Sequence, residues 1–149
     1  MRNLVVVVVL VLISACASSP KQMTDLGKLT TVEKMKLANI AYDEANLSKA
    51  ETLFYQITEE HPSLIEAWLK LGNVYVRQGR YTAAVRCFNE VLKLDNEDGR
   101  AWYNLALTRV KQAIEVLETA ERVVPIESEH QLYFLELHNR LEQKLSKQE

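Results

Sequence analysis

Apolar residues recur at intervals of three and four positions from Thr31 to the end of this 149-residue chain. Such spacing places apolar side chains along one face of a helix. In the same region Gly and Pro are confined to short segments between these stretches, where they mark turns, and no stretch alternates apolar and polar residues as a strand would. The pattern therefore predicts an all-α domain over residues 31–149.

The helical stretches repeat after 34 residues (84 − 50 = 34), because Ala50, Phe54 and Ile57 return as Ala84, Phe88 and Val91. A fixed period of this length is typical of proteins that stack helix pairs into a curved scaffold. No nucleophile motif, phosphate loop or dinucleotide fingerprint accompanies the repeats. The pattern thus indicates a binding scaffold and not an enzyme.

One window carries a family signature. Residues 65–98 contain Trp68, Leu71, Gly72, Tyr75, Gly79, Tyr81, Ala84 and Phe88. With these residues the window resembles a tetratricopeptide repeat, which implies two antiparallel helices. The small residues Gly72 and Ala84 let the two helices approach closely, and Gly79 suits the turn because it adopts a positive φ without a Cβ penalty.

The preceding window, 31–64, is a weaker copy in which Lys34 and Ala41 stand where the resemblance expects aromatic residues. Its turn has no Gly, and we expect Asn46 to take the left-handed backbone conformation there. Pro62 follows a helix that we expect to end near Glu60.

The third window, 99–125, is a degenerate repeat. It lacks the residues that would form the turn, and an apolar stripe continues without interruption from Trp102 to Val124. We therefore predict one long helix from about Arg100 to Val124. The alternative is an irregular turn within residues 108–112.

Residues 126–149 are expected to form a capping helix. Ser128 and Gln131 have the spacing of a capping box, and the helix is expected to end near Leu145. The residues predicted for its apolar side are Leu132, Phe134, Leu135, Leu137, Leu141 and Leu145. A polar outer side is needed because an unstacked apolar face aggregates.

The N-terminus reads as a signal peptide over residues 1–15. Arg2 precedes ten apolar residues from Leu4 to Ile13, about half the length of a membrane span. Residues 13–16, Ile-Ser-Ala-Cys, resemble the lipobox of bacterial lipoproteins. The resemblance implies a mature chain that begins at Cys16, with diacylglycerol and an N-linked acyl chain on that residue. An ordinary secretory signal is the alternative.

Ala17 follows the expected lipidation site. In bacterial lipoproteins an Asp at this position commonly retains the protein in the inner membrane, so the resemblance favours the periplasmic face of the outer membrane. Residues 16–30 are polar and resemble a flexible tether. Multiple acyl chains anchor stably, and no other cofactor is expected.

The charges and cysteines narrow the functional classes. Without Arg2 the chain holds 17 basic and 20 acidic residues (17 − 20 = −3), and the basic residues alternate with Glu along helical faces, which argues against nucleic acid as a partner. Cys87 has no intrachain partner once Cys16 is lipidated. We interpret it as a small packing residue, with intermolecular pairing as the alternative.

The resemblance also implies a concave groove, lined by the first helix of each repeat, that binds segments of other proteins. Carried over by phase, the groove residues are Met35, Asn39, Tyr42, Asp43, Leu69, Asn73, Val76, Arg77, Arg100, Tyr103 and Leu107. Asn39 and Asn73 are one period apart and suit a peptide backbone, although both also fit ordinary solvated helix positions. Met35 and Leu69 occupy sites where a Lys would favour a terminal carboxylate, so we expect an amphipathic or aromatic segment instead.

Three functional hypotheses remain open. The first is a lipid-anchored periplasmic scaffold, because the chain is similar to the small repeat lipoproteins of pilus assembly and secretion systems, and this implies envelope-machine components as partners. The second is a self-associating structural protein. The third is a metal-binding or enzymatic protein that uses the C-terminal histidines His130 and His138, although their spacing of eight is unusual for a helical metal site.

Overall fold

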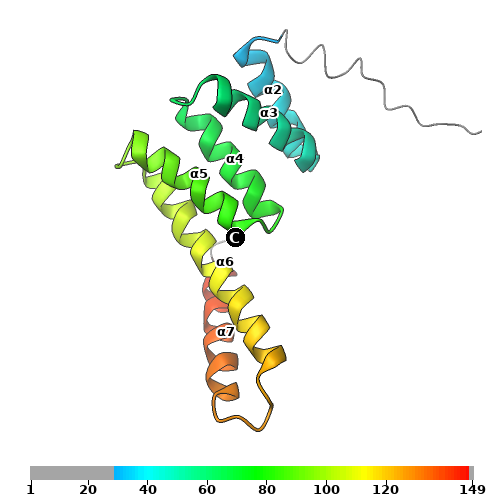
Figure 1. The fold of residues 1–149 in the computed structure, drawn as a ribbon, viewed down its shortest axis with the longest axis vertical. Helices are drawn as coiled ribbons and strands as arrows, with labels where there is room; N and C mark the ends of the chain where they lie inside the picture. The colour runs from blue at the N-terminus through cyan, green and yellow to red at the C-terminus, as the bar shows by residue number, and fades with distance from the viewer. Residues whose placement is uncertain (1–28, 148–149) are drawn as a thin grey trace, which may run out of the picture.

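The computed structural model describes residues 29–147, which form six helices and no strand (Figure 1). The helices are α2 (Thr31–Asp43), α3 (Leu47–Glu60), α4 (Ile65–Arg77), α5 (Tyr81–Leu94), α6 (Gly99–Val123) and α7 (Gln131–Leu145). The expected all-α repeat solenoid is confirmed. None of the helices in this part of the chain combines the length and apolar composition that a membrane span requires.

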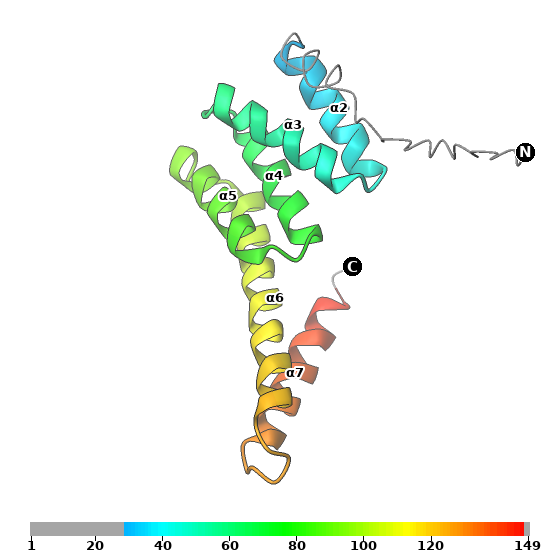
Figure 2. The same cartoon turned by 45° about the vertical axis from the view of Figure 1, so that its right-hand side comes forward.

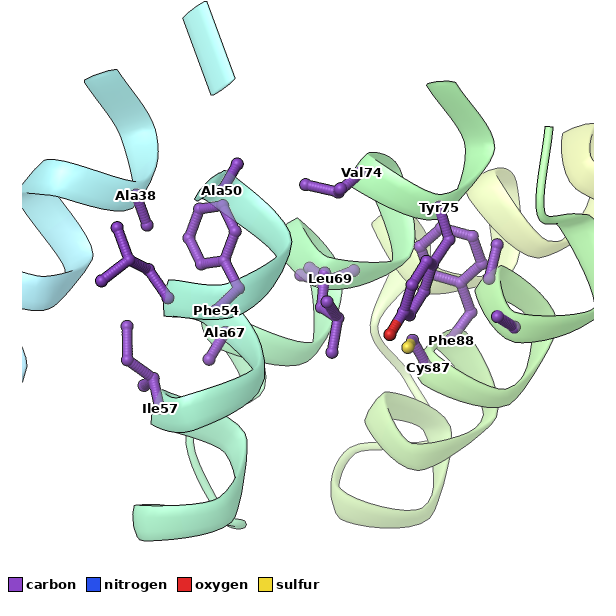
Figure 3. Close-up of a cluster of buried hydrophobic side chains, with 14 of the residues drawn as sticks. Ala38, Ala50, Phe54, Ile57, Ala67, Leu69, Val74, Tyr75, Cys87 and Phe88 are labelled. Atoms are coloured by element: carbon purple, nitrogen blue, oxygen red, sulfur yellow. The ribbon is translucent and has the colours of Figure 1, made fainter. Parts of the chain in front are cut away.

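Helices α2 to α5 form two stacked antiparallel pairs, and each helix packs on the next (Figures 1 and 2). We call residues 31–98 the repeat body. Its core is continuous across the four helices, with Phe54, Ile57 and Phe88 among its fully buried side chains (Figure 3). Because each helix between the first and last is covered on two sides, most of its apolar surface is removed from water.

The close contact between α4 and α5 depends on Gly72. A Cβ atom at this position would lie 2.5 Å from Cε1 of Phe88, well inside van der Waals contact. The expected role of the glycine in helix approach is therefore confirmed. Tyr75 and Cys87 belong to the same buried cluster as Phe88 (Figure 3).

The turns of the two repeats share one backbone geometry. The N–H of Asn46 donates to the carbonyl of Ala41 (2.8 Å), and the N–H of Arg80 donates to the carbonyl of Tyr75 (2.8 Å). The residue with positive φ is Gly79 in the second turn (71°), as expected, but Ala45 in the first (58°). The expectation for Asn46 is wrong, because this residue caps α3 by accepting from the N–H of Lys49.

Helix α6 is a single 25-residue helix, which confirms the long helix and excludes the alternative of a turn at 108–112. Its second half and α7 form an antiparallel hairpin that extends away from the repeat body (Figures 1 and 2). We call this hairpin, residues 109–147, the arm.

Two expectations for α7 are wrong. Ser128 and Gln131 form no capping box, because the side-chain amide of Gln131 donates to the carbonyl of Glu121 in α6 (3.1 Å). The side of α7 that faces α6 also differs from the expected apolar side. Leu132, Leu135 and Leu137 are exposed, since Gln131 and His138 share the inner side with Phe134, Leu141 and Leu145.

Candidate partner-binding groove

An open, mainly apolar pocket lies along α2 and reaches the start of α4. We call it the groove. Its lining residues are Thr31, Val32, Met35, Lys36, Asn39, Ile40, Asp43, Leu64 and Glu66. Ile40 and Val32 are exposed to 43% and 78%, so apolar side chains stand open at this surface without a covering helix.

The groove follows from the way α2 is oriented in the repeat body. Helix α2 begins at a capping box in which Thr30 accepts from the N–H of Glu33 (3.3 Å) and the Glu33 carboxylate accepts from the N–H of Thr30 (2.8 Å). The hydrogen bonds that the backbone and side chain of Thr30 donate to the Glu33 carboxylate lower its pKa. One side of α2 packs on α3 through Ala38 and Ala41, so the residues between them in the helix turn outward.

Lys34 keeps this orientation although it replaces an aromatic residue of the repeat pattern. It is 2% exposed, and its ammonium group donates to both carboxylate oxygens of Glu60 at the end of α3 (2.5 and 2.7 Å). A buried charge needs such a partner. A hydrogen bond between the side chains of Thr31 and His61 (2.6 Å) likewise joins the start of α2 to the end of α3.

The structure brings three of the expected groove residues, Met35, Asn39 and Asp43, into the groove. The amide of Asn39 donates to the carbonyl of Met35 within α2 (3.0 Å), which leaves its carbonyl oxygen available to a ligand. Its counterpart one period later, Asn73, is half-buried on α4.

Tyr42 and Arg77 interact with each other. The guanidinium of Arg77 donates to the carbonyl of Tyr42 (2.7 Å) and lies 4.5 Å from the centre of the Tyr42 ring. This contact joins the C-terminal ends of α2 and α4 and includes a cation–π interaction. Tyr42 and Arg77 therefore connect the two repeats, at the C-terminal end of the helices that were predicted to line the binding groove.

The prediction that Leu69 lines the groove is wrong. This residue is 3% exposed and belongs to the core, because α4 is covered by helices on both sides. It cannot offer a surface to a partner. Val76 and Leu107 are half-buried, whereas Tyr103 remains 52% exposed.

Arg100 connects the third window to the groove. Its guanidinium lies 3.0 Å from the carboxylate of Glu66, a groove residue 34 positions earlier, and 2.8 Å from that of Asp98. The hydrogen bond from Arg100 lowers the pKa of Asp98. Asp98 also caps α6 by accepting from the N–H of Ala101 (3.1 Å), so this cluster fixes α6 beside α4.

A further polar cluster holds the turn after α4 against α3. Glu51 accepts from Gln78 (2.9 Å) and Arg80 (2.7 Å). Burial acts to raise the pKa of Glu51, but these hydrogen bonds together with the positive charge of Arg80 and a contact with Tyr75 lower the pKa overall. Arg80 also lies 4.5 Å from the centre of the Tyr75 ring. These contacts hold the second repeat in a fixed orientation relative to the first.

The histidines and the cysteine of the described region have separate environments. His130 is exposed and lies near the rings of Tyr133 and Phe134. The ring of His138 forms a hydrogen bond with the carboxylate of Glu121 (2.9 Å). Residues 29–147 contain no group of three or more metal-ligating side chains that could hold an ion. Burial raises the pKa of the Cys87 thiol to about 12, so it is protonated at neutral pH, as its interpretation as a packing residue expects.

Sequence reasoning missed several groove residues, namely Thr31, Val32, Lys36, Ile40, Leu64 and Glu66. Extending the helical phase of Met35 and Asn39 by one position would have found Lys36 and Ile40. Leu64 and Glu66 carry no such signal, because they reach the groove only through the angle between α2 and α4.

Comparisons with known proteins agree with this architecture. Family profiles described as "TPR repeat" and "Tetratricopeptide repeat" match residues 72–112 and 35–84. Protein O-mannosyl-transferase TMTC3 of Homo sapiens is 26% identical over 66% of the chain. A TPR repeat-containing protein of Methanocaldococcus jannaschii is 32% identical over 49% of the chain, and the peroxisomal targeting signal receptor of Saccharomyces cerevisiae is 29% identical over 48%.

The chain covers only 11%, 14% and 12% of the lengths of these three relatives. The likeness therefore concerns the repeats and does not extend to the activities of the whole relatives. Repeats of this kind imply protein partners.

Proposed function

We propose that this tetratricopeptide-repeat protein is a lipid-anchored scaffold on the periplasmic face of the outer membrane, where it assists the assembly of a pilus or secretion system. It binds a segment of another envelope protein in the groove and performs no catalysis. The observation that carries the proposal is the groove itself, an apolar surface on the first helix of the repeat body with polar groups at its edges.

The lining residues indicate the chemistry of the bound segment. Val32, Met35 and Ile40 suit apolar or aromatic side chains, which lose contact with water on binding. Lys36 and Asp43 at the edge offer one charge of each sign, and Asn39 offers an amide. An amphipathic segment satisfies all of these groups at once.

The groove offers a terminal carboxylate only one lining cation, Lys36, which stands at its edge with the acidic Asp43. Met35 stands where a Lys would be needed, and Leu69 is buried. Arg100, which reaches the groove residue Glu66, is already paired with Glu66 and Asp98. An internal segment of a partner therefore fits better than a chain end.

The proposal for the anchor depends on Cys16 and the residues before it, which lie outside the described residues. Arg2, the ten apolar residues and the sequence Ile13-Ser14-Ala15-Cys16 have the order of a lipoprotein signal. A lipid at Cys16, followed by the polar residues up to Thr30, would hold the groove within reach of proteins that insert into the membrane.

Binding in the groove is tested by capture from envelope extracts that contain the full chain. A Met35→Glu, Ile40→Glu variant places charge on the apolar floor, and we expect it to lose the segment that the unaltered chain recovers. Asn89→Ala on the exposed surface of α5 is the control for general effects, because Asn89 lies outside the groove. Equal recovery of partners by the floor variant and the unaltered chain would contradict the groove.

The anchor is tested separately. We expect mass spectrometry to find acyl chains on an N-terminal Cys16. We expect a Cys16→Ala variant to carry no acyl chain, to keep its signal segment uncleaved and to be lost from the outer-membrane fraction. An unacylated Cys16 in the unaltered chain would remove the proposed localisation without affecting the groove.

A further inference from the structure

The arm is the least covered part of the described structure. Helix α7 has no buried residue, and Leu117 (7% exposed) is the one buried residue of α6 beyond Thr108. Two helices that pack only on each other leave most of their side chains in contact with water, and the arm accordingly has little buried core. Both views show the arm extending from the repeat body, so the body leaves most of it uncovered (Figures 1 and 2).

One side of the arm is apolar across both helices. In α6 the exposed Val116 (67%) and Val123 (75%) are seven residues apart. Ala113 precedes them and Ala120 lies between them on the same side of the helix. The inner side of α6 contains Leu117 and Glu121, and that of α7 contains Phe134 and His138. The position of each stripe relative to these inner residues decides which side of the hairpin it occupies.

The apolar stripe of α6 has its partner on α7. At 100° per residue Val116 and Val123 lie roughly 110–140° from the inner side of α6 in one rotational sense. Tyr133 and Leu137 lie roughly 100° from the inner side of α7 in the same sense. Because the helices are antiparallel, equal senses place both stripes on one side of the hairpin. Tyr133 and Leu137 are exposed to 66% and 48%.

This surface, which we call the arm face, therefore consists of Ala113, Val116, Ala120, Val123, Tyr133 and Leu137. Leu132 (74% exposed) lies on the opposite side of α7 by the same geometry. The small alanines between the larger side chains leave holes into which a similar helix surface can pack.

Charge is divided along the length of the arm. We call residues 109–112 and 139–147 the base and residues 121–136 the tip. Lys111 of the first base segment and Asn139 and Leu145 of the second line one pocket, so the two base segments lie close together. The base has five basic residues and one acidic residue, whereas the tip has four acidic residues and one basic residue.

We propose that the arm face binds the arm face of a second copy of this chain, with the two arms antiparallel, to form a four-helix dimer. In a two-fold arrangement the same surface meets itself, so the surface must be complementary to its own reversed copy. The antiparallel orientation satisfies this because each positive base lies over the negative tip of the other copy. A parallel dimer places Glu beside Glu and Lys beside Lys.

The same geometry places α6 against α6 of the second copy. When the base of one copy lies over the tip of the other, Arg109 of one α6 lies opposite Val123 of the other. Val116 is midway between these two positions (116 − 109 = 123 − 116 = 7), so the two-fold axis passes near Val116 and Val116 of one copy meets Val116 of the other. The repeat bodies then stand at opposite ends of the bundle with both grooves open. The dimer is independent of the proposed function, because none of its residues lines the groove.

The first test is charge reversal in the full chain in mild detergent, with mass measured by analytical ultracentrifugation. The base variant is Arg109→Glu, Arg140→Glu, Lys144→Glu, and the tip variant is Glu127→Lys, Glu129→Lys, Glu136→Lys. Each alone is expected to weaken the dimer at least about tenfold, because like charges then face each other. An equal mixture is expected to recover dimers, since a negative base meets a positive tip.

The mixture distinguishes an antiparallel contact from a general effect of charge. Failure of the mixture to recover dimers, or a monomer for the unaltered chain at all concentrations, overturns the proposal. Helical content measured by circular dichroism confirms that the variants are folded. Because the reversed side chains are exposed, we expect it to be unchanged.

The second test locates the interface. Val116→Lys is expected to abolish the dimer, whereas Leu132→Lys, on the opposite side of the arm, is expected to leave it unchanged. In membranes containing two tagged copies, Val123→Cys in one is expected to cross-link to Arg109→Cys in the other. A cross-link only between two copies of Val123→Cys, or only to a different protein, overturns the antiparallel dimer.

Discussion

The repeat body and the arm use the same helical spacing of apolar residues with opposite results. In the body, Phe54 and Phe88 are fully buried, whereas in the arm no residue of α7 is buried and Val123 is 75% exposed. The difference is the number of neighbours. A helix of the body is covered on two sides by stacked helices, and a helix of the arm is covered on one.

This difference indicates where the molecule is stable and where it opens. Local unfolding is least costly where few apolar contacts are lost. We therefore expect the amides of α4 and α5 to exchange slowly with solvent and those of α7 to exchange faster in the monomer. Formation of the proposed dimer would protect the arm.

The largest expected effect compares two phenylalanines, one in each region. Phe88→Ala removes a fully buried ring and is expected to reduce the free energy of unfolding by about 3–5 kcal/mol. Phe134→Ala in the half-buried inner side of the arm is expected to cost about 1 kcal/mol, since a smaller area returns to water. Urea unfolding measures both. Equal losses would show that the arm is packed as well as the body.

The next effect concerns the close approach of α4 and α5. Gly72→Ala places a methyl group 2.5 Å from a buried ring that cannot move aside, and we expect a loss of about 1–3 kcal/mol. Gly99→Ala is the control. No atom lies within 4 Å of its added Cβ, so its thermal unfolding temperature is expected to stay close to that of the unaltered chain. A neutral Gly72→Ala variant would contradict the role of Gly72.

A smaller effect compares the two turns of the body. Ala45→Gly is expected to stabilise the chain by up to about 1 kcal/mol, because an L-residue with a side chain is strained at positive φ. Gly79→Ala in the equivalent turn is expected to destabilise by a similar amount. Changes of the same sign in both variants, measured by thermal unfolding, would exclude strain as the cause.

The smallest expected effect is a pH dependence confined to the arm. The hydrogen bond to Glu121 raises the pKa of His138, burial acts against it, and the charges of Glu121 and Glu142 add to the rise. A raised folded pKa means that this stabilisation is fully present below about pH 6.5 and is lost as the pH rises through the folded pKa.

Hydrogen exchange of α7 measures this dependence. Its amides are expected to exchange more readily at about pH 8.5 than at about pH 5.5, after correction for the intrinsic rate. The amides of α4 serve as an internal control, and a His138→Gln variant is expected to lose the pH dependence. A change of equal size in both helices would contradict an origin in the arm.

Much of the repeat body could be predicted from local sequence. The small residue at Gly72 and the turn at Gly79 are local signals, because each depends on neighbouring positions in one helix or turn, and the period of 34 shows that the helix pair occurs twice. The long α6, outside the repeat body, was predicted from a local apolar stripe in the same way. Met35, Asn39 and Asp43, three of the residues predicted for the groove, line one pocket, and the phase of α2 accounts for their outward position. Their role in binding a partner stays a prediction.

Most of the errors arise where contacts between helices decide the position of a side chain. Leu69 is buried because helices on both sides cover α4, and Ala45 takes the left-handed conformation because the Schellman turn that ends α2 requires it there. Gln131 and His138 turn inward because Glu121 in α6 offers them acceptors. The outcomes for Leu69, Gln131 and His138 depend on a partner from another part of the chain, whereas that for Ala45 is decided within residues 41–46.

The sequence by itself determined that the helices form, where they end and that four of them repeat, because hydrophobic spacing and turn residues act over a few positions. Only the tertiary structure decided which faces are left uncovered. A groove along α2 and an apolar face on the arm arise where the stack ends or turns away, and the number of neighbours around a helix is a property of the whole assembly of helices.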